Sequence, residues 1–385
     1  MSKWKSGKAG PAIAAIAVLL ATLGLAACGG GSNGGIEGGS GGEAEKVTLE
    51  GEPSGSLTIS NWPLYIDEET VPNFEDESGV SVKYIEDINS NEEFFAKMQP
   101  LLAKGESGGR SVFVLADWMV AKMHELGYLQ EFDKSALPNV EKNLVPSLQS
   151  PSFDPDRAYT APWQSGMTGI IVRTDLAPDV RSICDLFDPE YKGKVEMLNE
   201  VRETAGLTLK CEGLDPNEAT EADWMKAIDK VGAAADSGQI RRFTGNDYAG
   251  DLTSGNAVAV IGWSGDAVQL QADNPNIEWR MPTEGCMLWS ENMVIPVGAP
   301  NPTAAEAWMN YVYDPKVQAN IAEYVNYVTP VDGVKEILAG RNPELAKNQL
   351  IFPSSSFTKN CSDSPALPGE EGENITQAFN AVLTG

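Results

Sequence analysis

Aromatic residues and carboxylates occur close together at several places in this sequence. They occur at Asn61-Trp62-Pro63-Leu64-Tyr65, Asp117-Trp118, Glu200 to Glu203, Trp263 to Asp266 and Trp289-Ser290-Glu291. Tryptophan and tyrosine faces attract cations by about 0.5–2 kcal/mol and also cover methylene groups. Carboxylates add charge-assisted hydrogen bonds to such a cation. The pattern therefore predicts a site that holds a cation.

The composition argues against several other functions. The chain has 385 residues, with 28 Lys+Arg against 55 Asp+Glu, so its formal net charge is −27. This acid excess argues against a nucleic-acid partner, because phosphate binding needs a basic face. The single histidine, His124, makes histidine metal clusters and Ser-His-Asp or Cys-His catalysis hard to build. We therefore expect no nucleic acid, no metal, no cofactor and no enzymatic activity.

Taken singly, the same residues have simpler explanations. Glu200 and Glu203 lie three positions apart in the first turn of an expected helix, where they share a face and the helix dipole favours acids by ~0.3–1 kcal/mol. A lone Trp62 or Trp263 would be explained as a core residue, and a lone Tyr327 carries almost no signal. The recurrence of tryptophan beside acids is what favours a binding site.

Alternating strands and helices must position these side chains. The expected strands are 57–61, 80–88, 112–115, 169–172, 195–198, 257–261 and 293–296. The expected helices are 67–77, 90–101, 119–126, 202–210, 304–313, 315–324 and 375–383, whereas 353–371 is expected to be irregular. This alternation predicts βαβ units, a mostly parallel sheet and, at this length, two domains. Ligands of such sheets bind beyond the carboxyl ends of the strands, where the aromatic and acidic residues lie.

The N-terminus has the pattern of a secretory signal. Three lysines among the first eight residues precede an apolar run from Ala12 to Ala27. The run ends Leu25-Ala26-Ala27-Cys28, which resembles a bacterial lipobox in which Cys28 is lipidated after removal of residues 1–27. The Gly/Ser-rich residues 28–55 predict a flexible tether that reaches about 30 Å. We therefore expect an extracytoplasmic protein anchored by lipid to the cell membrane, in the periplasm or on the outer face.

Four further cysteines lie in the body of the chain. They are Cys184, Cys211, Cys286 and Cys361. An even number of cysteines in an oxidising compartment favours disulfides. Because no two of them have CxxC spacing, the sequence gives little support for a zinc site. Three pairings are possible. Of these we favour Cys184–Cys211 with Cys286–Cys361.

Several segments resemble one protein family. Leu57–Ile66, Asn73–Tyr84, Asp188–Lys194 and Asn326–Pro330 resemble, in this order, segments of the polyamine-binding subunits of ABC importers. The resemblance extends from Ser56 to Val331. It implies an α/β, two-lobed type II periplasmic-binding-protein fold, in which a double crossover hinge joins two lobes that close over the ligand.

The resemblance also implies where the chain passes between the lobes. The crossovers are expected near Ser165-Gly166 and Ser290-Glu291. Lobe 1 would then comprise residues 56–165 and 291–335, and lobe 2 would comprise 166–290 and 336–385.

The family's binding residues can be carried over by position. The aromatic box would be Trp62, Tyr65, Trp118, Trp263, Trp289 and Tyr327, and the acids would be Glu200, Glu203 and Glu291. The family usually has Asp at the positions of Glu200 and Glu291, so the longer side chains are expected to shorten or shift the pocket. Many members have Ser/Thr-Tyr where this chain has Asp117-Trp118. Asp117 would be either an additional carboxylate or the N-cap of the helix that follows.

The leading functional hypothesis is a monomeric, lipid-anchored receptor that captures a polyamine and delivers it to an ABC permease. The sequence leaves putrescine, spermidine and other amines open. One alternative is a receptor of the same fold for a cationic amino acid, a sugar or ferric ion. A second alternative is a glycosidase, which would also use paired carboxylates and a tryptophan platform.

Overall fold

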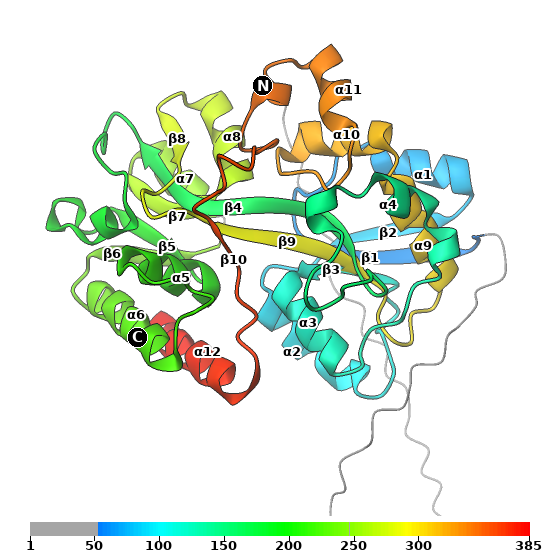
Figure 1. Cartoon of the computed structure of the whole chain (residues 1–385), viewed down its shortest axis with the longest axis horizontal. Coiled ribbons are helices and arrows are strands. Elements are labelled where there is room, and N and C mark those ends of the chain that lie inside the picture. Colours follow the sequence, from blue (N-terminus) through cyan, green and yellow to red (C-terminus); the bar gives the residue numbers. More distant parts are fainter. Residues whose placement is uncertain (1–52, 246) are drawn as a thin grey trace, which may run out of the picture. The chain divides into compact units, whose positions relative to one another are not determined.

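The computed structural model describes residues 53–245 and 247–385, which belong to one compact unit (Figure 1). The predicted leader of residues 1–27, the lipidated Cys28 and most of the tether at 28–55 lie outside the described residues. Within the described ranges, no helix is long and apolar enough to cross a membrane.

The strands pair in one sheet network of order β2-β1-β3-β9-β4-β7-β5-β6, with β10 paired to β9 and β8 paired to β4. The strands are β1 (Ser56–Asn61), β2 (Ser81–Glu86), β3 (Val112–Ala116), β4 (Ala161–Arg173), β5 (Val195–Leu198), β6 (Ile240–Thr244), β7 (Ala259–Trp263), β8 (Ile277–Arg280), β9 (Met287–Val294) and β10 (Ser362–Asp363). Ladders at the two ends of the network are parallel, but β4 and β9 are antiparallel to each other and to β7 and β3. The sheet is thus more mixed than predicted, because its two longest strands oppose their neighbours.

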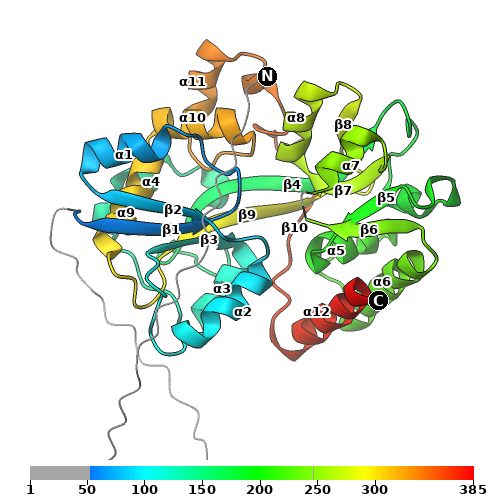
Figure 2. The same cartoon turned by 180° about the vertical axis from the view of Figure 1, so that it is seen from behind.

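Helices cover the sheet on both sides (Figures 1 and 2). They are α1 (Thr70–Ser78), α2 (Asn91–Leu102), α3 (Asp117–Glu125), α4 (Pro138–Asn143), α5 (Val201–Cys211), α6 (Glu221–Asp236), α7 (Tyr248–Ser254), α8 (Ser264–Asp273), α9 (Pro302–Val312), α10 (Pro315–Val325), α11 (Val334–Arg341) and α12 (Gly369–Thr384). The sequence predicts α1, α2, α3, α5, α9 and α10 close to their observed bounds. It also predicts α12, but from residue 375, whereas the helix begins at Gly369 within the segment expected to be irregular. Ser90 caps α2 as expected, since its side chain accepts a hydrogen bond from the backbone N–H of Glu93.

The apolar core falls into separate clusters in two halves of the body. Val195, Ile261 and Trp224 belong to a cluster around β5 and β7, whereas Leu57 and Trp308 belong to a cluster around β1 and α9. A smaller cluster packs α2 and α3 against β3. Beyond residue 335, α11 packs with the β1 cluster and α12 packs with the β5 cluster. The exact division of the chain into lobes stays a prediction.

Strands β4 and β9 lie side by side and run from one half of the body into the other (Figures 1 and 2). Ser165 lies opposite Ser290 in their ladder, and the two hydroxyl oxygens are 2.6 Å apart. The sequence places a strand at 293–296, but β9 begins at Met287 and ends at Val294. Strand β9 contains polar residues, so a search for apolar runs does not find all of it. These polar residues can be buried because the fold supplies their hydrogen-bond partners.

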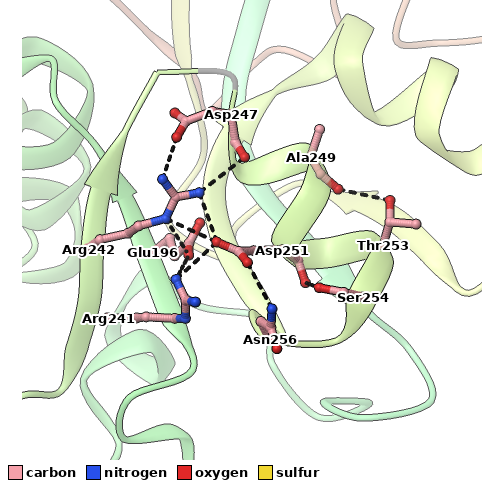
Figure 3. A network of polar contacts seen from close by, with 9 residues as sticks. All are labelled: Glu196, Arg241, Arg242, Asp247, Ala249, Asp251, Thr253, Ser254 and Asn256. Atoms are coloured by element: carbon pink, nitrogen blue, oxygen red, sulfur yellow. Dashed lines mark hydrogen bonds and ion pairs between the residues drawn. The ribbon is translucent and has the colours of Figure 1, made fainter.

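A buried acid joins the outer strands of the second half to α7 (Figure 3). Glu196 is fully buried on β5, and its Oε1 atom lies 3.1 Å from both Arg241 Nη1 and Arg242 Nε. A register shift after Val195 makes Arg241 the extra residue of β6, so consecutive arginines reach the same acid. Both arginines also pair with Asp251 of α7. Burial nevertheless raises the pKa of Glu196 to about 7, and its Oε2 atom has no hydrogen-bond partner among the described residues, so the network offsets only part of the cost of burying this acid.

Two disulfides have the pairing favoured from the sequence. Cys184 is bonded to Cys211 at the end of α5, with a Cα–Cα distance of 5.3 Å. Cys286 precedes β9 and is bonded to Cys361, which precedes β10, with a Cα–Cα distance of 4.3 Å. The second bond attaches the C-terminal segment beside the two central strands.

Candidate ligand-binding site

One cavity of about 120 Å³ brings together all ten residues predicted for the ligand site. They are Trp62, Tyr65, Asp117, Trp118, Glu200, Glu203, Trp263, Trp289, Glu291 and Tyr327. Most come from segments at the carboxyl ends of β1, β3, β5 and β7, while Trp289 and Glu291 lie within β9. Parallel strands of both halves therefore direct their ends toward one place, as open α/β sheets do.

Three of the aromatic side chains pack against one another around this cavity, and Tyr65 and Tyr327 do so edge to face. The ring centroids of Tyr65 and Tyr327 are 5.4 Å apart at an interplanar angle of 86°, and those of Trp289 and Tyr327 are 5.5 Å apart. Glycines allow the rings to pack so closely. A Cβ atom on Gly166 would lie 2.3 Å from the Trp289 ring, and one on Gly265 would lie 2.5 Å from the Tyr327 ring.

Glu291 is a buried acid on β9. Its Oε2 atom accepts a hydrogen bond from Trp62 Nε1 at 3.0 Å, and the residue is 8% exposed. Burial raises the pKa of Glu291 well above its ordinary value, and the nearby Asp117 and Glu203 raise it further, against the lowering effect of Trp62. The neutral acid is thus favoured until a cation lies beside it.

Asp117 is a further carboxylate in the cavity wall and is partly buried, as one of the two alternatives from the sequence proposed. It is the first residue of α3, and Ala116 is the N-cap, so the N-cap interpretation of Asp117 is wrong. Its side chain accepts a hydrogen bond from Asn292 Nδ2. Burial raises the pKa of Asp117 to about 6, although Asn292 and Arg157 lower it.

Glu200 and Glu203 place two acids at the start of α5. Glu200 is the N-cap residue in extended conformation, and Glu203 lies in the first turn. Within the described part of the chain, Glu203 Oε2 has no hydrogen-bond partner. Burial raises the pKa of Glu203 to about 7, against hydrogen bonding from Thr168 and the charge of Arg202. The pKa of Glu200 is also raised, first by burial and then by the charges of neighbouring acids.

Asp266 is a site residue that the sequence did not identify. It lies in the first turn of α8, three positions after Trp263, and lines the same cavity. Tyr248 Oη donates to its Oδ2 at 2.6 Å, and Tyr327 Oη donates to its Oδ1 at 2.7 Å. Burial raises the pKa of Asp266, while both tyrosines lower it. The same signal, an acid close after a strand-end tryptophan, could have identified it.

Other residues of the cavity wall carry little sequence signal. Asn91, Gln269 and Ser364 line it through α2, α8 and the segment after β10. Pro63 and Leu64 complete the wall near Trp62, and Leu64 is 61% exposed.

The acids are arranged in two places around the aromatic rings. The charges of Glu203 and Glu291 help to raise the pKa of Glu200, and those of Asp117 and Glu203 help to raise the pKa of Glu291, so these four acids form one group. Asp266 instead contacts Tyr248 and Tyr327. Tyr65 packs against Tyr327, which donates the hydrogen bond to Asp266. Such a cavity can hold an extended apolar chain over the rings with positive groups at its ends.

Among residues 53–245 and 247–385, no three His, Cys, Asp or Glu side chains converge as metal ligands.

Two linked halves and a cavity at the meeting point of their strand ends define a two-lobed solute receptor. The chain belongs to the bacterial extracellular solute-binding protein family, whose model matches residues 69–353. The spermidine/putrescine-binding periplasmic protein of Escherichia coli K12 is 29% identical over 313 residues, which cover 80% of this chain and 86% of the relative. The putrescine-binding periplasmic protein of the same organism is 31% identical over 323 residues, covering 77% of this chain and 83% of the relative.

Solved structures confirm the predicted type II periplasmic-binding-protein fold. A Listeria monocytogenes protein described as a spermidine/putrescine ABC transporter superposes with a TM-score of 0.77 at 31% identity, over 85% of this chain and 98% of the other. The spermidine/putrescine ABC transporter substrate-binding protein of Streptococcus pneumoniae has a TM-score of 0.70 at 26% identity, over 85% and 99%. The family resemblance inferred from the sequence is confirmed as well.

Proposed function

We propose that this protein binds a linear di- or polyamine of the putrescine or spermidine type and delivers it to an ABC permease. One observation carries the proposal: five carboxylates, of which Glu203 and Glu291 are buried, and six aromatic side chains line a single cavity. The printed names of the relatives support the same ligand class.

Each part of the cavity matches one part of such a ligand. The rings can cover the methylene groups and attract the ammonium charges. Glu291, Glu203 and their neighbours would hold one ammonium group, and Asp266 would hold another. Because the site draws residues from both halves of the body, a bound ligand would favour the closed lobes, which a permease could recognise.

A binding protein is a better account of these acids than an enzyme. A glycosidase needs two carboxylates about 5–10 Å apart across one bond, with one of them protonated as a general acid. Here several acids surround an aromatic box, and the family consists of solute-binding transport proteins. We infer that the protein is a monomeric receptor without enzymatic activity.

The anchoring part of the proposal rests on the sequence. Cys28 follows Leu25-Ala26-Ala27, and lipid on its thiol would hold the receptor at the membrane outside the cytoplasm. Replacing Cys28 with Ser should release the protein into the soluble extracellular or periplasmic fraction. Retention of the Cys28→Ser protein in membranes would contradict lipid anchoring at this residue.

Calorimetric titration tests the ligand. The protein should bind putrescine or spermidine with micromolar or tighter affinity, and a neutral sugar should produce no heat of binding. If neither amine binds, the polyamine proposal is wrong. Binding of lysine or arginine in their place would favour a receptor for cationic amino acids.

A further inference from the structure

Trp118 separates the ligand cavity from a second cavity. It lines both the site described above and a cavity of about 540 Å³ between helices α2 and α3 on one side and α12 on the other. These helices face each other across the two halves of the body (Figures 1 and 2). The side chain that holds this tryptophan therefore controls a wall of the ligand site.

That side chain is Arg202, which comes from the opposite half. Its guanidinium carbon lies 3.6 Å from the centroid of the Trp118 ring. Trp118 packs against the α2–α3 cluster, whereas Val201 and Ala205, on either side of Arg202, belong to the β5 cluster. The stacked pair thus bridges the two halves.

The C-terminal segment holds the guanidinium in place. Arg202 Nε donates to the carbonyl of Pro365 at 2.8 Å, and Nη2 donates to that of Ala366 at 2.9 Å. Its Nη1 atom lies 3.8 Å from a carboxylate oxygen of Glu92 on α2, which is a second link across the halves. With only 4% of its surface exposed, Arg202 is fixed from three directions.

Arg202 is positively charged, so by charge alone it should disfavour a cation in the neighbouring site. Its positive charge lies close enough to Glu200 and Glu203 to lower their pKa values, so it offsets part of their negative potential. A purely electrostatic view therefore predicts that removal of Arg202 improves amine binding. Its contacts, however, join both halves and the C-terminal segment, which indicates a different role.

We propose that Arg202 is a positioning residue that latches the closed lobes, by stacking on Trp118 while the carbonyls of Pro365 and Ala366 hold it. The effect on ligand affinity rests on the proposed function. The latch itself does not, because it acts on lobe closure whether or not a ligand is present.

The test compares Arg202→Gln and Arg202→Lys with Lys122→Gln. Lys122 lines the same second cavity, but its ammonium lies over Phe95 of its own half, 5.1 Å from the ring centroid. Arg202→Gln should weaken putrescine binding by about 2- to 30-fold, mainly through faster dissociation in stopped-flow tryptophan fluorescence. Arg202→Lys retains the charge but loses the planar stack and the paired carbonyl bonds, so it should also weaken binding. Lys122→Gln should leave the affinity unchanged.

Small-angle X-ray scattering of the ligand-free proteins provides the independent readout. Arg202→Gln and Arg202→Lys should both increase the radius of gyration relative to wild type, whereas Lys122→Gln should not. Equal or tighter amine binding by Arg202→Gln, or an unchanged radius in both arginine variants, would overturn the latch. If wild type binds no amine, the proposed function fails, but the scattering comparison still decides whether Arg202 holds the lobes together.

Discussion

Trp62 Nε1 donates a hydrogen bond to Glu291 Oε2 at 3.0 Å, although the residues are 229 positions apart. Trp62 follows β1, and Glu291 lies in β9 opposite Ala116 of β3. The bond fixes the orientation of the carboxylate relative to an aromatic wall of the cavity. It thereby joins the two kinds of side chain that the proposed ligand requires.

Glu291→Gln tests this acid directly. Without the carboxylate charge, a bound ammonium group would be buried without its partner. We expect putrescine and spermidine affinity to fall by ~2–5 kcal/mol, which is roughly 30- to several-thousand-fold. Titration calorimetry measures the change. The control is Glu344→Gln, because the exposed Glu344 side chain pairs with Lys347 and does not line the cavity, so this change should not alter binding. Unaltered affinity of Glu291→Gln would mean that this acid does not hold the amine.

The glycines behind the rings provide a second test, in which no ligand-contacting group is removed. Gly166→Ala should displace Trp289, and Gly265→Ala should displace Tyr327, since each new Cβ atom would lie under 3 Å from the ring. Displacing a packed ring costs about 1–3 kcal/mol, so we expect roughly 5- to 150-fold weaker amine binding if the strain falls on the site. Gly250→Ala is the matched control, because a Cβ atom there has no neighbour within 4 Å among the described residues. Equal affinities for all three variants would show that the ring positions do not matter.

Much of the fold follows from local patterns, and the errors have physical causes. Apolar runs identify strands such as β3, and 3.6-residue spacing identifies helices such as α2. The strand predicted at 293–296 begins six residues too late compared with β9, because Ser290, Glu291 and Asn292 are polar yet buried. Their partners Ser165, Trp62 and Asp117 lie far away in the sequence. A local pattern cannot show partners that only the fold supplies.

The sequence identified those site residues whose acids and aromatic side chains lie close together along the chain. Asp266 was missed even though the Trp263–Asp266 segment attracted attention, because its tyrosine partners lie on other elements. Ser364 belongs to a segment expected to be irregular, and only the pairing of β10 with β9 brings it to the cavity. The role of Arg202 likewise depends on contacts with Trp118 and the C-terminal segment, which no sequence spacing reveals.

The disulfide at the end of α5 should affect stability rather than binding. Cys184 and Cys211 are 27 positions apart, so their bond should contribute ~3–4 kcal/mol by restricting the unfolded chain. Replacing both with Ser should lower the free energy of unfolding by about that amount, measured by urea denaturation. Amine affinity should stay the same, because neither cysteine lines the cavity. Unchanged stability would show that the bond is absent or energetically silent, and a loss of affinity would show that α5 depends on it.

The raised pKa values of two cavity acids predict that amine binding depends on pH. The pKa of Glu203 is raised to about 7 and that of Asp117 to about 6, so both are partly protonated in the ligand-free protein near neutrality. An ammonium ligand stays charged throughout this range and favours the ionised acids. Binding should therefore release protons, and affinity should rise as the pH increases from 5.5 to 8.

The stability of the ligand-free protein should change in the opposite direction. Because these carboxyl groups have a higher pKa in the folded state than in the unfolded chain, the stability they contribute is complete in acid and is lost as the pH rises through about 6 to 7. A saturating amine should remove much of this loss, so the ligand-induced increase in melting temperature should be larger at pH 8 than at pH 5.5.

Calorimetry at pH 6.5 in phosphate and in Tris measures the proton release directly. These buffers differ in ionisation enthalpy, so released protons should give different apparent heats of putrescine binding in the two buffers. Glu203→Gln should reduce this difference, while the exposed-site variant Glu344→Gln should not. Equal heats in both buffers for the wild-type protein would show that the acids are already ionised before the ligand enters, and that burial does not control their charge.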